Sequence, residues 1–430
     1  MNKNGLSGLD VLIDSHDLAM PAGTGIKSYG LQLISVLKDL GATPELLVSS
    51  RTDGNPLVAT SMLYDHPHRN ERDVTGWRRV LKQRIRFGSV KAMHVPPVNG
   101  HGGPVVPDSV FPHGMGCSVL FNCYRASRAI QIKTKTIATF QTAKKYRVWH
   151  ATQPLSLRHK EAVQITTIHD LIPILYPHLC DELRPLFYQR VKDSLRNSRA
   201  VAVDSESTKA DLLRHFTVPE EKIVVTHLYS GISRADADPR TIDMTMKVFN
   251  LEPRNYILFV GTLDSRKNVR RLVEAYLSLG SDQALVLVGK PGWAGDEELS
   301  VLTHVKKGRG QDVRQLAYVS RPMLAALYQA ASCLVFPSHS EGFGLPVLEA
   351  MASGCPVVCS STTSLPEVGG DAVEYVEPLS VESIAAGLAK VLGDNAHRQK
   401  LIERGYKRAE HFSRERFAGK IAELYARALA

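Results

Sequence analysis

Residues 340–354 read SEGFGLPVLEAMASG and place a glycine-rich bend between two glutamates, Glu341 and Glu349. The residues before them, SCLVFPS (332–338), form a short apolar run that is typical of a buried parallel strand. Pro346 suits the first turn of a helix, where its missing N–H is not needed. The stretch therefore predicts a strand, a loop and a helix, with one carboxylate in the loop and the other about one turn inside the helix.

The start of this helix has the features of an anion-binding site. Backbone N–H groups at a helix N-terminus have no partner within the helix, and glycines let a ligand approach them closely. The residues concerned are Gly342, Phe343, Gly344 and Leu345. The carboxylate of Glu349 is suited to accept two hydrogen bonds from a vicinal diol such as that of a ribose. Two glutamates alone, however, support an acidic surface helix equally well.

Strand-like and helix-like segments alternate along the chain, which predicts an α/β protein with parallel sheets. One series begins at LDVLIDSH (9–16) and a second at NYILFVG (255–261). The 430 residues are too many for one ordinary core, and the polar residues 231–253 are predicted to link two domains. We therefore expect two doubly wound, Rossmann-like domains, residues 1–235 and 236–411, that face a central cleft.

Two other strand-end loops carry residues suited to chemistry. In GTLDSRKN (261–268), Arg266 and Lys267 lie at the start of the next predicted helix. Adjacent cations at the carboxyl edge of a parallel sheet suit a diphosphate that gains negative charge as it leaves. In TTIHDLIP (166–173), His169 follows an apolar strand and is expected to point into the cleft. The alternatives are a solvated basic turn for the first loop and a loop-capping histidine for the second.

The first strand is followed by the small-residue stretch AGTGIKS (22–28), in which Gly25 precedes a predicted helix and could approach a phosphate or a sugar. The dinucleotide fingerprint G-x-G-x-x-G requires a glycine at position 28, and Ser28 stands there instead. A nicotinamide-binding site is therefore only weakly supported.

The net charge of +10 is concentrated in one region. Residues 74–160 contain 15 Lys and Arg but a single acidic residue, Asp108, and WRRVLKQRIRF (77–87) is predicted to form a basic helix. A solvated face is one interpretation. The concentration favours an anionic partner, either a phosphate-bearing acceptor or an anionic membrane surface.

The six cysteines include no C-x-x-C pair, and three of them lie in apolar runs. Buried, reduced thiols fit this pattern better than disulfides or a zinc site. No apolar run reaches the roughly 18 residues of a membrane-spanning helix, and the N-terminus does not resemble a secretory signal. We therefore expect a cytoplasmic protein.

The segment E-G-F-G-L-P-x-L-E-A-M-A-x-G-x-P-V strongly resembles the E-x7-E signature of the retaining glycosyltransferases of family 4, which have the GT-B fold. Three other segments lie before it in the chain, in the order that this family shows: I-H-D-L-I-P, G-T-L-x-x-R-K-N and L-A-Y-V-S. The resemblance is dense from about residue 165 to 428 and thin between 50 and 160.

This resemblance implies roles for individual residues. Glu349 would bind the ribose of a nucleotide sugar, and Glu341 would contact the donor sugar and help to stabilise the transition state. Arg266 and Lys267 would hold the diphosphate. His169 would contact the sugar from the opposite domain.

Further positions follow from the same resemblance. Gly25 would let the acceptor side approach the phosphates, Gly261 belongs to the donor-binding set, and Val319 would meet the base through its backbone. Many relatives carry an arginine directly after the strand glycine, where this chain has Thr262. Arg266 is the candidate to take over that role.

The family also implies that no metal or other cofactor is needed, because cationic side chains and a helix terminus stabilise the charge. The anomeric configuration would be kept, with front-face attack by the acceptor. The last helix, within residues 412–430, would cross back to the first domain.

Together these features indicate a retaining hexosyltransferase of surface polysaccharide or O-antigen synthesis. The expected donor is GDP-mannose or a related GDP-deoxyhexose, and the acceptor is a glycan or a polyprenyl-diphosphate-linked sugar. Peripheral contact with the cytoplasmic face of the inner membrane would involve the basic residues 74–160. The alternatives are a GT-B nucleotide-sugar epimerase, which needs no acceptor, and a basic nucleic-acid-binding protein, for which the region has no evident recognition motif.

Overall fold

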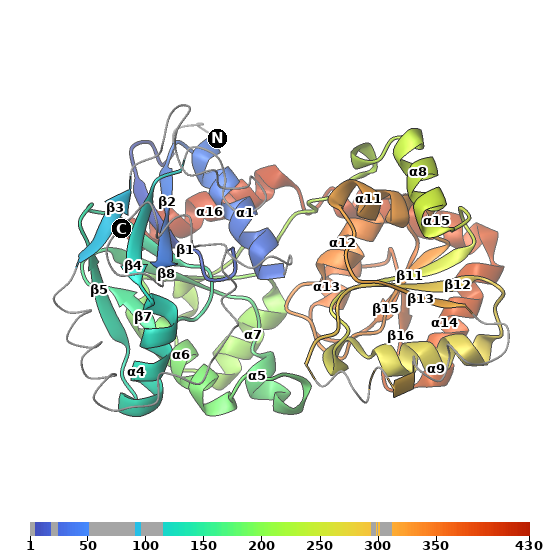
Figure 1. The fold of residues 1–430 in the computed structure, drawn as a ribbon, viewed down its shortest axis with the longest axis horizontal. Helices are drawn as coiled ribbons and strands as arrows, with labels where there is room; N and C mark the ends of the chain where they lie inside the picture. Colours follow the sequence, from blue (N-terminus) through green and yellow to red (C-terminus); the bar gives the residue numbers. More distant parts are fainter. Residues whose placement is uncertain are drawn as a thin grey trace.

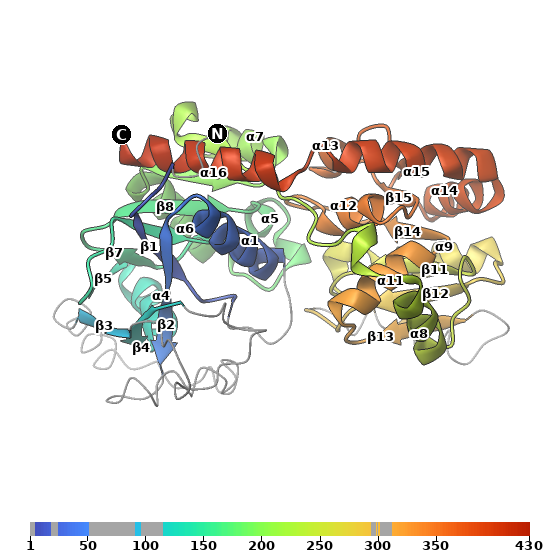
Figure 2. The same ribbon diagram turned by 90° about the horizontal axis from the view of Figure 1, so that it is seen from above.

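The computed structural model describes residues 5–18, 25–50, 91–95, 115–293, 298, 300–301 and 312–430. In this part the chain forms two α/β domains that lie side by side (Figures 1 and 2). The predicted basic helix at residues 77–87 lies outside the described residues. None of the helices described is long and apolar enough to cross a bilayer.

The N-terminal domain contains a ten-stranded sheet in the order β10-β9-β8-β6-β1-β2-β4-β3-β5-β7. All neighbouring strands are parallel except β3 and β4, which are antiparallel. The strands are β1 (Asp10–Asp14), β2 (Thr43–Ser50), β3 (Lys91–Val95), β4 (Cys117–Phe121), β5 (Ala138–Thr142), β6 (Val148–Ala151), β7 (Leu157–His159), β8 (Val163–Ile168), β9 (Ala200–Val203) and β10 (Ile223–Val225). The helices are α1 (Gly25–Asp39), α4 (Cys123–Thr134), α5 (Ile172–Leu175), α6 (Arg184–Asn197) and α7 (Glu206–His215).

The C-terminal domain contains a six-stranded, fully parallel sheet in the order β13-β12-β11-β14-β15-β16. The strands are β11 (Tyr256–Val260), β12 (Ala284–Val288), β13 (Val313–Leu316), β14 (Cys333–Phe336), β15 (Val357–Ser360) and β16 (Glu374–Val376). The helices are α8 (Pro239–Phe249), α9 (Val269–Leu279), α11 (Arg321–Ala330), α12 (Leu345–Ala352), α13 (Leu365–Gly369), α14 (Val381–Gly393) and α15 (Asn395–Ala409), and the chain ends with α16 (Arg414–Leu429).

The central strands explain why the sequence predicted parallel sheets. β12 and β14 read ALVLV and CLVF, and every residue of both is buried, because helices cover both faces of the sheet. The same holds for β9, AVAV, in the N-terminal domain. The prediction of two α/β domains with parallel sheets is therefore confirmed.

The interpretation of residues 231–253 as a plain linker is wrong for its second half. Asp238 caps α8 by accepting a hydrogen bond from the Thr241 N–H at 2.7 Å, and the helix packs against α11. The apolar period is hidden because Met246 is buried while Met244 and Val248 are 52% and 60% exposed. Two exposed apolar side chains on a short helix obscure the buried face.

The last helix lies on the N-terminal domain, as Figure 2 shows. α16 packs against α1 and against β8, β9 and β10. The Tyr425 hydroxyl lies 2.9 Å from Nδ1 of His150, and the buried ring of Phe417 makes an edge contact with the Tyr29 ring at 6.2 Å. The chain end therefore holds the two domains together.

Part of the basic charge in residues 74–160 is neutralised within the fold. Nζ of Lys144 lies 2.8 Å from a carboxylate oxygen of Asp10 and 2.7 Å from one of the buried Glu45. All six cysteines carry free thiols, and all but Cys180 are buried, as expected for a reduced protein.

We predict that Phe417→Ala destabilises the protein by about 3–5 kcal/mol, because it leaves a cavity between α16 and the N-terminal domain, where the ring contacts Tyr29 and Tyr229. Arg416→Ala, at the exposed neighbouring position, is the control and should change the stability by no more than about 0.5 kcal/mol. Urea unfolding of the full chain measures both. Equal effects of the two substitutions would show that α16 contributes no packing energy.

Candidate donor site at the domain cleft

Residues 333–352 form a strand, a loop and a helix. β14 ends at Phe336, residues 337–344 form a loop, and α12 begins at Leu345 with Pro346 in its first turn. Gly344 has φ 110°, a conformation that favours glycine, and a Cβ there would lie 2.6 Å from Leu365. The N–H groups of residues 342–345 donate to no other group in the described part of the chain. These N–H groups are therefore unpaired, and the anion site at the helix start stays a prediction.

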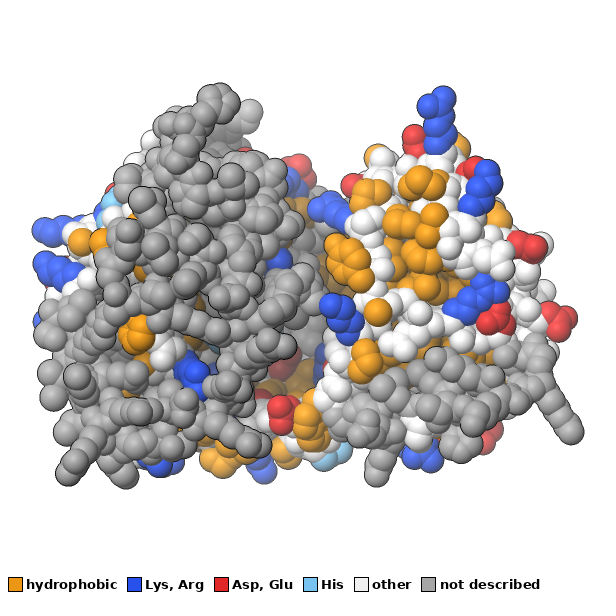
Figure 3. Space-filling model, in the orientation of Figure 1, with side chains coloured by type: hydrophobic (Ala, Val, Ile, Leu, Met, Phe, Trp, Pro, Cys, Tyr) orange, Lys and Arg blue, Asp and Glu red, His pale blue; other side chains and the backbone are white. Residues whose placement is uncertain are grey.

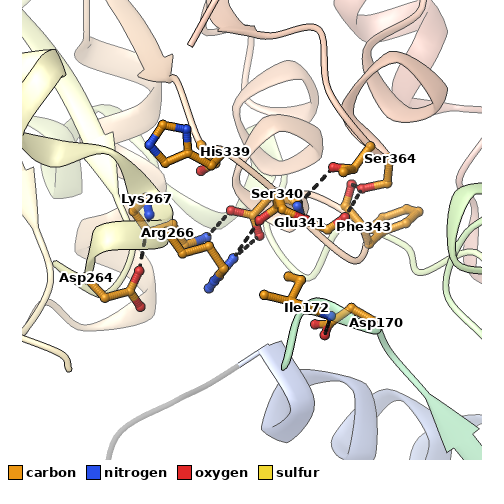
Figure 4. Close-up of polar contacts among 12 residues, drawn as sticks. Asp170, Ile172, Asp264, Arg266, Lys267, His339, Ser340, Glu341, Phe343 and Ser364 are labelled. Atoms are coloured by element: carbon orange, nitrogen blue, oxygen red, sulfur yellow. Dashed lines mark hydrogen bonds and ion pairs between the residues drawn. The ribbon is translucent and has the colours of Figure 1, made fainter. Parts of the chain in front are cut away.

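Glu341 lies in the 337–344 loop between two cations (Figure 4). Its carboxylate accepts a hydrogen bond from Nη1 of Arg266 at 2.7 Å and from Nζ of Lys267 at 2.6 Å. Burial alone would raise the pKa of Glu341, but the charges of Arg266 and Lys267 outweigh it and hold the pKa at about 2. Glu341 is thus ionised, and the three side chains together carry one positive charge.

The two cations come from a short turn that follows β11. Asp264 begins this turn and accepts a hydrogen bond from the Lys267 N–H at 3.2 Å. Burial lowers the pKa of Lys267, while the facing Glu341 carboxylate favours the charged ammonium. The ammonium also lies 4.5 Å from the centre of the Phe336 ring, a cation–π contact. The Glu341 carboxylate and the Phe336 ring therefore offset part of the cost of burying the ammonium.

The turn after β11 and the 337–344 loop are fastened to each other. The Arg266 carbonyl accepts a hydrogen bond from the His339 N–H at 2.9 Å. The Arg266 guanidinium donates a hydrogen bond to the Ser340 carbonyl at 3.2 Å. The side-chain amide of Asn268 donates to the carbonyls of Pro337 and Pro378. Because β11 and β14 are neighbours in the sheet, these two loops form one rigid wall of the site.

The backbone conformation favours glycine after β11, because Gly261 has φ 153°, which residues with a Cβ rarely adopt. A Cβ on Gly261 would lie 3.4 Å from Cε of Lys267, and a Cβ on Gly289 would lie 1.9 Å from the Gly261 carbonyl oxygen. Thr262, which stands where an arginine was expected, is exposed. Arg266 is the guanidinium that the structure places against Glu341, and whether it replaces the missing arginine remains a prediction.

Glu349 lies one turn inside α12, as predicted. Its Oε2 accepts a hydrogen bond from the Tyr328 hydroxyl at 3.0 Å. Burial raises the pKa of Glu349 to about 7, against the lowering effects of Tyr328 and of the charge of Arg321. A half-buried carboxylate with one hydrogen bond and a raised pKa gains stability from a further donor. Val319 is half-buried in the loop between β13 and α11.

His169 differs from the expectation that it points into the cleft. Its Nδ1 lies 2.6 Å from Oδ2 of Asp204 and its Nε2 lies 2.8 Å from the Thr152 carbonyl oxygen. Burial lowers the pKa of the ring, but Asp204 outweighs this effect and raises it to about 9. Both ring nitrogens of the imidazolium are therefore paired within the N-terminal domain. Its backbone is what reaches the other domain, because a Cβ on Gly342 would lie 2.4 Å from the His169 carbonyl oxygen.

Asp170 lies across the cleft from Arg266 (Figure 4). Its Oδ1 accepts a hydrogen bond from the Ile172 N–H at 2.9 Å and so caps the loop after β8. Burial raises the pKa of Asp170, and the charge of Arg266 lowers it. The fold thus brings this carboxylate close to the ion-pair cluster of Glu341, Arg266 and Lys267.

A polar cluster in the N-terminal domain was missed from the sequence. Asp14 accepts a hydrogen bond from the Thr152 N–H, and the amide of Gln153 reaches Asp17 and His16. The cluster lies at the carboxyl ends of β1 and β6, which are neighbours. The run DSHD (14–17) directly after a strand was the available signal.

The structure does not test two further expectations, which concern Gly25 and the absence of a metal. Gly25 is the first residue of α1, and a Cβ on it would meet nothing within 4 Å, so its proposed closeness to a phosphate stays a prediction. Among the described residues, no three His, Cys, Asp or Glu side chains gather as a metal site requires.

The surface between the two domains is hollowed, as Figure 3 shows, and the ion-pair cluster lies at this junction.

Comparisons with known proteins agree with this geometry. Residues 243–408 match the family model described as "Glycosyl transferases group 1". The O-antigen chain mannosyltransferase B of Escherichia coli is 33% identical over 275 residues, which cover 63% of this chain and 71% of that protein. The O-antigen chain mannosyltransferase RfbU of Salmonella typhimurium is 31% identical over 232 residues, 53% of this chain and 59% of that protein.

The solved structure of a sucrose-phosphate synthase from Thermosynechococcus elongatus superposes with a TM-score of 0.66 and covers 97% of this chain and 98% of the other. At 19% identity this likeness concerns the fold, which is GT-B. The family model, the relatives and the fold agree with the E-x7-E segment and the loops that surround it. This chain belongs to the group 1 glycosyltransferases and is a glycosyltransferase enzyme.

Proposed function

We propose that this enzyme transfers mannose, or a related deoxyhexose, from a GDP-sugar to a glycan or polyprenyl-diphosphate-linked acceptor in surface polysaccharide synthesis. The observation that carries the proposal is the Glu341 carboxylate shared by Arg266 and Lys267 beside the start of α12. The names of two relatives, both O-antigen chain mannosyltransferases, support the sugar and the process.

The charges at the cluster suit a diphosphate. Arg266 and Lys267 contribute two positive charges, and ionised Glu341 cancels one of them. A diphosphate brings two negative charges and accepts hydrogen bonds from both cations and from the free N–H groups of residues 342–345. In this proposal the diphosphate competes with Glu341 for the cations, and the released carboxylate turns to the hydroxyls of the donor sugar.

Glu349 completes the donor site in this proposal. Its carboxylate accepts hydrogen bonds from the two ribose hydroxyls, and the backbone at Val319 contacts the base. The sugar then lies beside Glu341, and His169 contacts it from the N-terminal domain. The transfer retains the anomeric configuration by front-face attack of the acceptor, and the cationic side chains stabilise the leaving diphosphate without a metal.

The direct test is an assay of purified protein with GDP-, UDP- and dTDP-sugars, with and without a lipid-diphosphate-linked acceptor, in excess EDTA. We expect transfer only from a GDP-sugar and only with acceptor, with no loss in EDTA and with retained configuration in the NMR spectrum of the product. Turnover of the donor without acceptor would instead favour an epimerase. Loss in EDTA that a divalent metal restores would reject the metal-free mechanism.

Glu349→Ala and Lys267→Ala should each weaken GDP-mannose binding about 10- to 100-fold, because each removes a hydrogen bond that involves a charged group. Glu274→Ala is the matched control, since Glu274 pairs with Arg270 on the surface of α9. Isothermal titration calorimetry measures the affinities and thermal unfolding checks the fold. Wild-type affinity in either site variant would contradict the assignment.

GDP-mannose binding should release protons near pH 7. The free enzyme holds Glu349 with a pKa of about 7, so about half of the molecules carry the proton there. Ribose hydroxyls that donate to the carboxylate stabilise its charged form and lower the pKa, so affinity should rise as the pH increases from about 6 to 8. Calorimetry in two buffers with different ionisation enthalpies measures the release. Glu349→Gln should abolish it, and an equal release in that variant would assign the proton to another group.

A further inference from the structure

Glu367 of the C-terminal domain reaches across the junction to the N-terminal domain. It lies on α13, and its two carboxylate oxygens accept hydrogen bonds from the first N–H groups of α7, from Glu206 at 2.8 Å and from Ser207 at 3.2 Å. A carboxylate at a helix N-terminus is favoured because it meets unpaired N–H groups and the positive end of the helix dipole. One side chain thereby caps a helix of the other domain.

The same carboxylate has a third partner in the N-terminal domain. Nε2 of His227, in the loop after β10, lies 2.5 Å from Oε1 of Glu367. The His227 ring makes an edge contact with Phe412 at 5.6 Å and lies 6.2 Å from Phe343 in the 337–344 loop. The contact is therefore packed among aromatic rings at the junction.

The first turn of α7 also contacts both loops that face each other across the cleft. The Ser205 hydroxyl donates to the Gly342 carbonyl at 2.7 Å, next to Glu341. The Thr208 hydroxyl donates to the His169 carbonyl at 3.0 Å. The turn that Glu367 caps is thus bonded on one side to the 337–344 loop and on the other to the His169 loop, residues 169–171 between β8 and α5.

We propose that Glu367 is a positioning residue for sugar transfer: by clamping α13 to the start of α7, it holds Glu341 and the His169 loop at their working separation. The inference rests on the proposed function, because it assumes that the sugar is bound where these two loops meet. Glu367 itself does not contact the reacting atoms. Without the clamp, the two domains separate more easily, and the site is assembled in a smaller fraction of the molecules.

The chain offers a matched control for this clamp. Glu374 also pairs with a histidine and a lysine, His397 and Lys390, each at 2.8 Å, but all three residues belong to the C-terminal domain. Glu374→Ala therefore removes a similar set of contacts without touching the junction.

The experiment compares Glu367→Ala, Glu367→Gln and Glu374→Ala with the wild type. Small-angle X-ray scattering without substrate measures the radius of gyration, and steady-state kinetics with GDP-mannose gives kcat and KM. Calorimetry gives the affinity for GDP-mannose, and thermal unfolding reports the stability of each variant.

We expect Glu367→Ala to increase the radius of gyration and to lower kcat about tenfold or more. The affinity for GDP-mannose should stay within about threefold, because its proposed contacts from Lys267 and Glu349 lie within the C-terminal domain. Glu367→Gln keeps an acceptor for an α7 N–H and should restore part of kcat. Glu374→Ala should leave the radius of gyration, kcat and affinity at wild-type values.

Two results would overturn the inference. In the first, Glu367→Ala keeps the wild-type kcat and radius of gyration. In the second, Glu374→Ala lowers kcat as much as Glu367→Ala does, so the loss reflects general destabilisation. The scattering measurement needs no substrate. An expanded Glu367→Ala variant of a protein without transferase activity would therefore support the clamp and reject the proposed function.

Discussion

The buried Glu341 carboxylate, shared by Arg266 and Lys267, is the interaction on which the rest of the site depends. Burying charges is costly unless each is paired, and removal of one partner leaves the others uncompensated in a poorly hydrated place. The ion-pair cluster therefore fastens the turn after β11 to the loop after β14. It also leaves one positive charge at the cleft, beside the free N–H groups at the start of α12.

The position of this cluster at the domain junction links ligand binding to domain geometry. Gly342, the residue after Glu341, packs against the His169 carbonyl so closely that a side chain would not fit. The Ser205 hydroxyl holds the Gly342 carbonyl from the N-terminal domain. The loop that carries the ionised Glu341 carboxylate is thus part of the domain interface. A movement of this loop therefore affects the interface, and a movement of the domains affects the loop.

The sequence predicted the local structure well where burial imposes a pattern. The apolar runs of β11 and β14 and the Gly-Pro start of α12 were recognised because strand burial and helix capping are local constraints. Prediction failed at α8, whose exposed Met244 and Val248 hide its buried face. It also missed the antiparallel β3, because pairing between strands far apart in the chain leaves no local signal.

By itself the sequence determined the fold class, the order of the loops and the residue types at the cleft, since each follows from spacing along one strand or helix. Only the tertiary structure decided which groups pair. It placed Glu341 between two cations, turned the His169 ring toward Asp204 and Thr152, and brought Glu367 to α7. Protonation follows from these neighbours, because burial and nearby charges act through space, and partners far apart in the chain meet only in the folded protein.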